Sequence, residues 1–280
     1  MNKVTRGILD ILWYLVVFFL LQLVFCLVGA LVMSFQNGFS IEEIGKCYLE
    51  VAKNGKMLAV CTALSGIMTI LLFYRLKWAE LGKTYLNTRP WGALLWVMLL
   101  AVGTILPAEW IYEQMQIAMP EAYEQMFEGI MKEPWGYLAI GIVAPLAEEI
   151  VFRGAILGKL LKLLGRQRRW IAIVISAIIF GLIHGNIAQG VHAFIIGLLL
   201  GWMFCRTNSV VPGVVFHWVN NTVAYVMYNI MPQMNDGKLI DLFHGDHKMM
   251  IGGIFFSLCI FIPSLFQLTL RLKNTDGNSK

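Results

Sequence analysis

The chain has 280 residues, of which 58% are hydrophobic and only 14% are charged. A soluble domain carries about 25% charged residues, so this composition excludes an ordinary water-soluble enzyme and indicates a protein that lies in lipid. The net charge of +5 is modest and falls mainly between the apolar blocks, which favours an anionic membrane surface over nucleic acid as the partner.

The hydrophobic residues fall in eight blocks, most of them near the roughly 20 residues that cross a bilayer. Continuous apolar blocks are typical of helices, whereas membrane β-barrels show short alternating segments. The first block is too long for a signal peptide and has no clean cleavage site, so we expect it to be retained. We therefore predict an all-α, polytopic bundle of about eight transmembrane helices, at residues 8–33, 57–74, 91–112, 135–158, 170–185, 189–205, 209–230 and 249–270.

The basic residues of the loops predict the orientation of these helices. If both termini are cytoplasmic, 15 of the 22 basic residues lie in inner loops and six in outer loops. This bias agrees with the positive-inside rule. The inner residues are Lys3, Arg6, Arg75, Lys77, Lys83, Arg89, Lys159, Lys162, Arg166, Arg168, Arg169, Arg206, Arg271, Lys273 and Lys280.

We expect one membrane domain with three parts. Residues 1–134 would supply the N-terminal membrane helices, 135–230 a catalytic core, and 231–280 the last membrane helix and a tail. The five cysteines form no C-x-x-C pair and lie mostly in apolar blocks, which predicts reduced thiols without a disulfide framework.

The fourth block contains ionisable residues, which are costly at membrane depth and mark a function or a buried pair. Glu149 and Arg153 are four residues apart and share a helix face, as expected for a buried ion pair. Glu148 points about 100° away and has no basic residue at helical spacing within the block. A hydrated cavity with a carboxylate of raised pKa is what general-base chemistry requires.

Two further polar motifs lie in later blocks. His184 stands near the end of the block 170–185, and a single histidine there is usually a packing residue. His217 and Asn221 lie four residues apart, so both can direct N–H donors to one point, as in an oxyanion hole. A hydrogen-bonded pair between helices is the alternative for these two residues.

The depth of the motifs connects them. At ~1.5 Å per residue, Glu148, His184 and His217 lie ~15, ~21 and ~12 Å from the predicted cytoplasmic ends of their helices. These depths agree within the uncertainty of the helix ends, so we expect the three residues to share one layer inside the membrane.

The ordered set Glu-Glu-x-x-x-Arg, Phe-x-x-x-His and His-x-x-x-Asn resembles the CPBP family. This family includes the CAAX prenyl-protein endopeptidases and the bacterial Abi proteins related to bacteriocin self-immunity. The resemblance covers residues 145–223 and includes all three motifs in the family's order. The first three predicted helices resemble the family only in being hydrophobic.

The resemblance implies a role for each motif residue. Glu148 would activate water and His184 would work with it. His217 and Asn221 would stabilise the oxyanion, while Glu149 and Arg153 would shape the site. No catalytic cysteine or serine is expected.

The metal requirement has two alternatives. A zinc ion would find three ligands in Glu148, His184 and His217, with one position open. However, no H-E-x-x-H is present, asparagine is a poor zinc ligand, and coordination would occupy the best base. We favour the metal-free alternative, without a cofactor. We expect His192 to be structural, and His244 and His247 to lie in a solvated loop rather than at a metal site.

Together these features predict an intramembrane endopeptidase that cleaves a membrane-anchored or lipidated peptide, in contact with membrane lipid and not with nucleic acid. Cleavage of CAAX substrates is implied by the family alone. We expect an integral protein of a bacterial inner membrane. One alternative is a non-catalytic membrane protein for bacteriocin immunity or partner scaffolding. Another is a small transporter with a proton relay, against which the absence of paired repeats argues.

Overall fold

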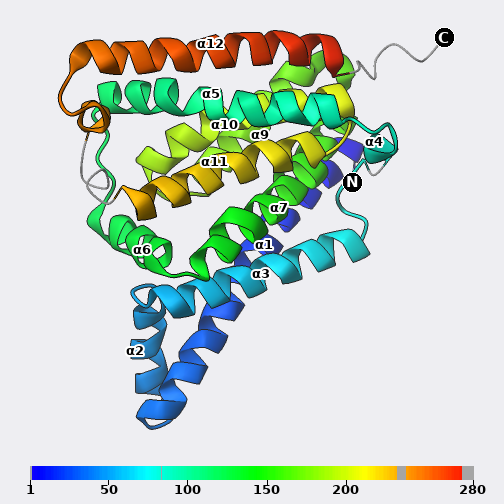
Figure 1. Cartoon of the computed structure of the whole chain (residues 1–280). Coiled ribbons are helices and arrows are strands. Elements are labelled where there is room, and N and C mark those ends of the chain that lie inside the picture. The colour runs from blue at the N-terminus through cyan, green and yellow to red at the C-terminus, as the bar shows by residue number, and fades with distance from the viewer. Residues whose placement is uncertain (1, 83, 232–237, 273–280) are drawn as a thin grey trace. The chain divides into compact units, whose positions relative to one another are not determined.

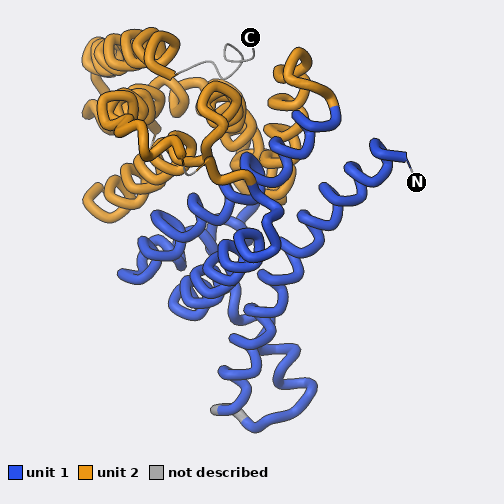
Figure 2. The backbone as a smooth tube through the Cα atoms, turned by 90° about the vertical axis from the view of Figure 1, so that its right-hand side faces the viewer, with its two compact units in different colours: residues 1–79, 120–163 blue, residues 80–119, 164–280 orange. Residues whose placement is uncertain are grey.

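A computed structural model describes residues 2–82, 84–231 and 238–272 of the chain (Figure 1). Over these residues the regular elements are helices and no strand is present, which confirms the all-α prediction. The chain divides into two compact units, coloured separately in Figure 2. Unit 1 is Met1–Ala79 with Pro120–Leu163, and unit 2 is Glu80–Met119 with Leu164–Lys280. The functional division predicted at residues 134 and 230 stays a prediction.

Among its described residues, unit 1 contains four separate helices and all but the last residue of one long composite helix, residues 137–164, which we call the glutamate helix. The separate helices are α1 (Lys3–Asn37), α2 (Ile41–Val51), α3 (Gly55–Arg75) and α6 (Glu121–Lys132). The glutamate helix runs through η1 (Tyr137–Val143), α7 (Ala144–Glu148), η2 (Glu149–Leu157) and α8 (Gly158–Leu164).

In its described residues, unit 2 contains the remaining membrane helices and three short elements. The long helices are α5 (Trp91–Met115), α9 (Arg169–Leu182), α10 (Ile187–Thr207), α11 (Val211–Ile230) and α12 (His247–Arg271). The short elements are α4 (Thr84–Asn87), η3 (Arg166–Arg168) and η5 (Leu239–Phe243).

Each of the eight predicted membrane segments coincides with a helix. Within the described residues, α1, α3, α5, α10 and α12 are long and apolar enough to cross a membrane. The glutamate helix, α9 and α11 are shorter in their regular parts or more polar. A helical membrane bundle therefore fits both the sequence and the structure, and the chain is an integral membrane protein.

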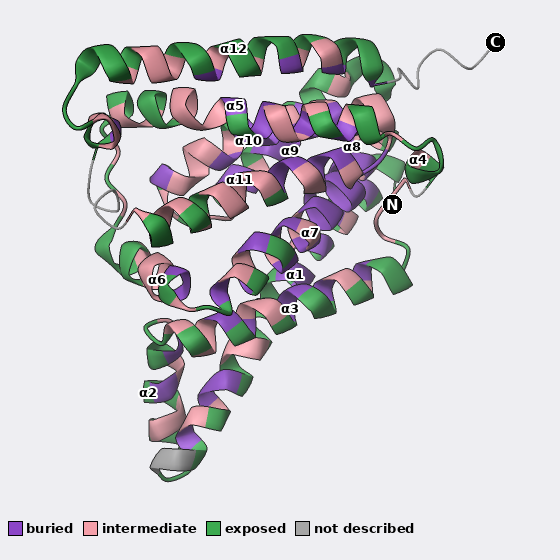
Figure 3. Ribbon diagram, viewed as in Figure 1, coloured by how far each residue is buried: buried purple, intermediate pink, exposed green. Residues whose placement is uncertain are grey.

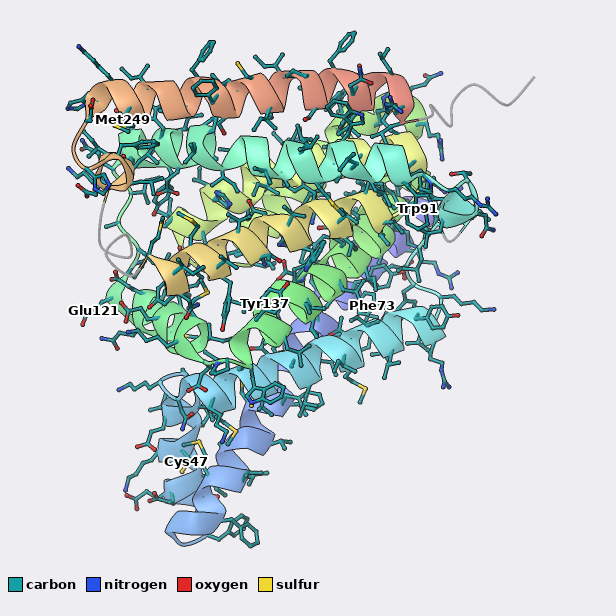
Figure 4. The ribbon with its side chains drawn as sticks, in the orientation of Figure 1. Cys47, Phe73, Trp91, Glu121, Tyr137 and Met249 are labelled. Carbon is teal, nitrogen blue, oxygen red and sulfur yellow. The ribbon has the colours of Figure 1, made fainter. Side chains whose placement is uncertain are left out.

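Two amphipathic helices were not predicted, because they are short and their apolar residues occupy only one face; the four-residue α4 was not predicted either. One of them, α2, begins at the cap Ser40, whose hydroxyl accepts a hydrogen bond from the backbone N–H of Glu43. It buries Cys47 against α1 and α3, in a cluster with Ala30 and Cys61 (Figure 4, where Cys47 is labelled). The other, α6, packs on α3 where Gly55 and Gly129 meet backbone to backbone.

The glutamate helix packs on α1 and α3 through its apolar side chains. Val143 and Ala147 lie against Gly66 of α3, where an added Cβ would come within 2.5 Å of Val143. Phe152 contacts Phe18 of α1 edge to face, with ring centroids 5.7 Å apart. These contacts hold the polar residues between Ala147 and Gly154 at a defined rotation in unit 1.

The glutamate helix has π geometry in η1, before Glu148, and in η2, which begins at Glu149. Such segments are rare and occur frequently at functional sites. Pro145 stands in the regular turn between them and cannot donate a backbone hydrogen bond. All residues of η2 are buried, so this part of the helix has no lipid-facing or water-facing stripe.

In unit 2, α12 runs alongside α5 (Figure 1) and α10 alongside α9. An added Cβ on Gly103 of α5 would approach the backbone of Phe261 to 2.7 Å, and one on Gly181 of α9 would approach the carbonyl of Gly190 to the same distance. Small residues at these crossings let the helices touch through their backbones. Figure 3 shows how little of α12 is buried, as expected for a helix that faces lipid.

Candidate functional site

The acidic half of the predicted site lies in unit 1, on the glutamate helix. Glu149 and Arg153 are buried completely, with 0% and 1% of their surface exposed. The Nη1 atom of Arg153 lies 2.8 Å from Oε1 of Glu149, so the two side chains form a buried ion pair. The pairing expected from their spacing is confirmed.

Glu148 lies in a different environment from its neighbour. It is half-buried, whereas Glu149 is fully buried, although they are consecutive in the chain. Consecutive residues of a helix point about 100° apart, which accounts for the contrast. The two carboxylates therefore differ in environment. Glu149 forms a buried ion pair with Arg153, whereas the side chain of Glu148 is partly exposed.

The imidazole half lies in unit 2 and begins at His184. This residue stands beyond the end of α9, which stops at Leu182, and not inside the helix as predicted. Its Nδ1 atom lies 2.9 Å from the backbone carbonyl of Phe180. A carbonyl oxygen can only accept, so Nδ1 must donate, and in the neutral ring Nε2 carries the lone pair. The backbone thus selects the tautomer in which Nε2 can act as a base or ligand.

A compact turn joins His184 to α10. Gly185 adopts a φ of +70°, a conformation that glycine tolerates easily. The side chain of Asn186 then caps α10, since its oxygen accepts from the N–H of Gln189 at 2.9 Å. The Nδ2 atom of Asn186 donates to the carbonyl of His184 at 3.1 Å and to Oε1 of Gln189 at 2.8 Å. This amide therefore ties the backbone of His184 to the first turn of α10.

Sequence reasoning missed Asn186, although a signal was available. An asparagine directly before an apolar helical block is a preferred N-cap. The sequence does not show that Asn186 also donates a hydrogen bond to the backbone carbonyl of His184.

His217 and Asn221 lie four residues apart on α11, as predicted. His217 is buried, with 8% of its surface exposed, and Asn221 is half-buried. The ring of Phe180 contacts His184 and His217 edge to face, with centroid distances of 5.2 and 6.0 Å. One aromatic side chain thus separates and orients the two predicted site histidines.

His192 belongs to the same neighbourhood. It lies two residues after Gly190, where α10 touches α9, and it interacts electrostatically with both His217 and His184. The sequence alone did not place it near the motif histidines. Unit 2 therefore gathers three imidazoles from the α9–α10 turn, α10 and α11.

The structure thus describes two half-sites, each within its own unit. In unit 2 it brings His184 and His217 together around Phe180, and in unit 1 it joins Glu149 to Arg153. The convergence of Glu148 with His184, His217 and Asn221, and the catalytic roles of all six residues, stay predictions.

The donor chemistry of the half-sites is compatible with a metal ligand at one position. A ligating histidine usually donates its other ring nitrogen to a carbonyl or carboxylate, as His184 does to Phe180. Over the described residues of the chain, however, no three acidic, histidine or cysteine side chains are grouped so that they could hold a metal ion.

The loop histidines lie in a surface segment whose carboxylates have structural roles. His244 and His247 are both exposed. Asp246 caps α12 by accepting from the N–H groups of Lys248 and Met249, and Asp241 accepts from the N–H of Lys238. His244 therefore lies in an exposed turn, as predicted, whereas His247 is the first residue of α12 and not a loop residue. The five cysteines are free thiols, though Cys259 is exposed and not buried.

Residues 130–223 match the family described as type II CAAX prenyl endopeptidase Rce1-like. This segment contains all six predicted site residues, so the resemblance drawn from the three motifs is confirmed.

Two bacterial relatives match parts of the chain. YdiL of Bacillus subtilis (strain 168), described as a candidate membrane peptidase, is 25% identical over 135 residues, which are 48% of this chain and 52% of YdiL. The UPF0177 protein YxdF of Lactococcus lactis subsp. lactis (strain IL1403) is 25% identical over 79 residues, covering 28% of this chain and 41% of YxdF. The chain thus spans about half of the length of these relatives or less. No solved structure matches it.

Proposed function

We propose, on the premise that this chain belongs to the Rce1-like CAAX endopeptidase family, that it is an intramembrane endopeptidase. It would hydrolyse one peptide bond of a membrane-anchored or lipidated substrate. The observation that carries the proposal is that the segment matched to the family, residues 130–223, holds all six polar motif residues within an otherwise apolar membrane protein.

The first step assigned to the chain is activation of water. Glu148 is half-buried, and it interacts electrostatically with Arg153, which also forms the ion pair with Glu149. A carboxylate in this position would take a proton from water as the water oxygen attacks the peptide carbonyl. His184, whose Nδ1–H is held by the Phe180 carbonyl, would present the lone pair of Nε2. Nε2 would accept the proton that Glu148 took from water and pass it to the amine nitrogen as the peptide C–N bond breaks.

The second step is stabilisation of the tetrahedral oxyanion. His217 and Asn221 lie on one face of α11, and each can contribute an N–H donor. Donors that are already oriented in a water-poor site stabilise developing charge more than they stabilise the substrate carbonyl. The ring of Phe180 against His217 restricts its orientation and supports this role.

We further propose that the chain works without a resident metal, in a bacterial inner membrane, with both termini in the cytoplasm. The bias of basic residues towards one set of loops supports the orientation. The two relatives come from bacteria, which supports the location. A metal-free reaction leaves Glu148 available as the base.

The test uses the full chain in lipid nanodiscs and a fluorescent, lipidated peptide. Wild type should cleave one bond, and Glu148→Gln, His184→Ala and His217→Ala should each lose nearly all activity. Glu133→Gln, a glutamate outside the three motifs, serves as the matched control and should remain active. If the three site variants retain wild-type activity while folded, the proposal is wrong, and a non-catalytic immunity or scaffolding protein becomes the better hypothesis.

The metal question is settled in the same assay. Prolonged dialysis against a strong chelator should leave the rate unchanged, and elemental analysis of the active protein should show less than one zinc per chain. Loss of activity that is restored by zinc would overturn the metal-free mechanism while leaving the peptidase proposal intact.

A further inference from the structure

A small pocket lies between the beginning of α9 and the end of α10, within unit 2. Its volume is about 40 Å³, far below the roughly 300–1,000 Å³ of sites for small-molecule substrates. The pocket suits a group of a few atoms rather than a peptide or a nucleotide. It is lined by Arg169, Trp170, Ile173, Trp202, Cys205 and Arg206.

The chain segment that forms this pocket carries only basic charged residues. No aspartate or glutamate occurs between Glu149 and Asp236, a stretch that includes α9, α10 and α11. From residue 164 to residue 235, the charged residues are four arginines, two of which line the pocket. Two arginines that line one pocket attract an anion, and guanidinium groups favour the oxygens of a phosphate.

The walls of the pocket are fixed by packing. An added Cβ on Gly201 would meet Ile173 at 2.9 Å, so α10 lies directly against α9 one turn from the arginines. The guanidinium of Arg206 donates to the backbone carbonyl of Thr269 on α12, which restricts its position. A binding group held in this way loses less side-chain freedom when an anion arrives.

The two tryptophans distinguish a lipid phosphate from a free one. Trp170 is 55% exposed and Trp202 is half-buried, and both stand at the helix ends beside the arginines. Tryptophan at a helix end occupies the headgroup level of a bilayer, with its apolar ring towards the acyl chains. A phosphate that carries hydrocarbon would satisfy both the arginines and the indole rings.

We propose that this pocket binds the phosphate headgroup of an anionic phospholipid. The lipid would occupy the leaflet that surrounds the basic ends of α9 and α10, with its phosphate between Arg169 and Arg206 and its first acyl carbons along Trp170 and Trp202. The proposal is independent of the peptidase function and applies equally to a non-catalytic protein.

The test measures lipid retained by the purified full chain in native mass spectrometry. Phosphatidylglycerol is compared with phosphatidylcholine of the same acyl chains, and inorganic phosphate is added in large excess as the soluble competitor. Wild type should retain phosphatidylglycerol preferentially, and inorganic phosphate should not displace it. Arg169→Gln should lower retention about fivefold, the effect of one basic residue near a lipid headgroup.

The matched control is Arg168→Gln, which removes the same charge one residue earlier from an exposed side chain that does not line the pocket. This variant should retain lipid like wild type. Trp202→Leu provides a second pocket variant that leaves the charge unchanged, and it should also lose retention.

Three results would overturn the proposal: equal loss in Arg168→Gln and Arg169→Gln, unchanged retention in both Arg169→Gln and Trp202→Leu, or displacement by inorganic phosphate. The first would indicate diffuse surface charge, and the last a soluble anion.

Discussion

In unit 1 the site residues are held by a buried ion pair within a single helix, whereas in unit 2 they are held by hydrogen bonds to the backbone around a helix end. Glu149 and Arg153 occupy a fully buried, π-widened segment. His184 and Asn186 lie in the turn between α9 and α10, where carbonyl groups are available as acceptors.

The two kinds of interaction should have different effects: the ion pair of unit 1 on the stability of the fold, and the hydrogen bonds of unit 2 on the orientation of a side chain. A buried charge that loses its partner is left uncompensated in a medium of low dielectric constant, so the ion pair should matter mainly to folding. A backbone carbonyl that loses a side-chain donor near a helix end can often reach water instead. The bonds around His184 should therefore matter mainly to the direction of its ring.

The largest effect on the cleavage rate should come from Glu148, the proposed base, which lies in unit 1. Glu148→Gln keeps the size of the side chain and removes the base, so the rate should fall about 10³-fold or more. Because Glu148 is half-buried, the unfolding midpoint should change little. Cleavage rates and thermal unfolding of the same preparation test this, and a variant with more than a tenth of the wild-type rate would contradict the assignment.

The second effect is on stability. Arg153→Met should lower the free energy of unfolding by about 3 kcal/mol, because Glu149 would stay buried without its cation. The double variant Glu149→Leu with Arg153→Met should recover most of this loss. Denaturation in mild detergent measures both, with Arg75→Met at the exposed end of α3 as the control. Equal losses in the single and double variants would show that the pair itself is not the cause.

The oxyanion assignment predicts a smaller loss of rate. Asn221→Ala should lower kcat about 10²-fold with little change in KM, since a donor to the oxyanion acts mainly in the transition state. Asn220→Ala changes the adjacent asparagine, which points to another face of α11, and should remain active. Steady-state kinetics of the two variants decide the matter: a similar decrease in both would argue against a specific role for Asn221.

The smallest effect should distinguish the two functions of Asn186. Asn186→Ala should cost about 1 kcal/mol of stability, as the loss of an N-cap does. Asn186→Asp retains the oxygen that accepts from Gln189 but cannot donate to the carbonyl of His184. We expect Asn186→Asp to keep stability and lose activity by about tenfold. If both variants lose activity only in proportion to stability, Asn186 is a cap and not a positioning residue.

The membrane helices and the motif residues could be predicted from the sequence because both depend on local patterns. Apolar length determines which segments can cross lipid, and the spacing of four residues placed Glu149 beside Arg153 and His217 above Asn221. The amphipathic α2 was missed although the run from Ser40 to Glu43 has the spacing of a capping box. Hydropathy does not detect such a short helix, because its burial depends on contacts with α1 and α3.

Other features depended on contacts between distant residues. The sequence did not indicate that α9 would end before His184, that Asn186 would hold its carbonyl, or that His192 would lie near the other two histidines. The sequence also contains no pattern that predicts the π segments η1 and η2 on either side of Glu148.

By itself, therefore, the sequence determined that this is a helical membrane protein, because backbone groups in a bilayer must be hydrogen-bonded within a helix. It also determined which polar residues lie within the apolar segments, where a charge is costly and marks a function or a buried pair. The tertiary structure decided how those residues are held. The tautomer of His184, the burial of Glu149 and the gathering of imidazoles around Phe180 depend on which helix surfaces touch, and close packing selects those surfaces through shape rather than through any local pattern.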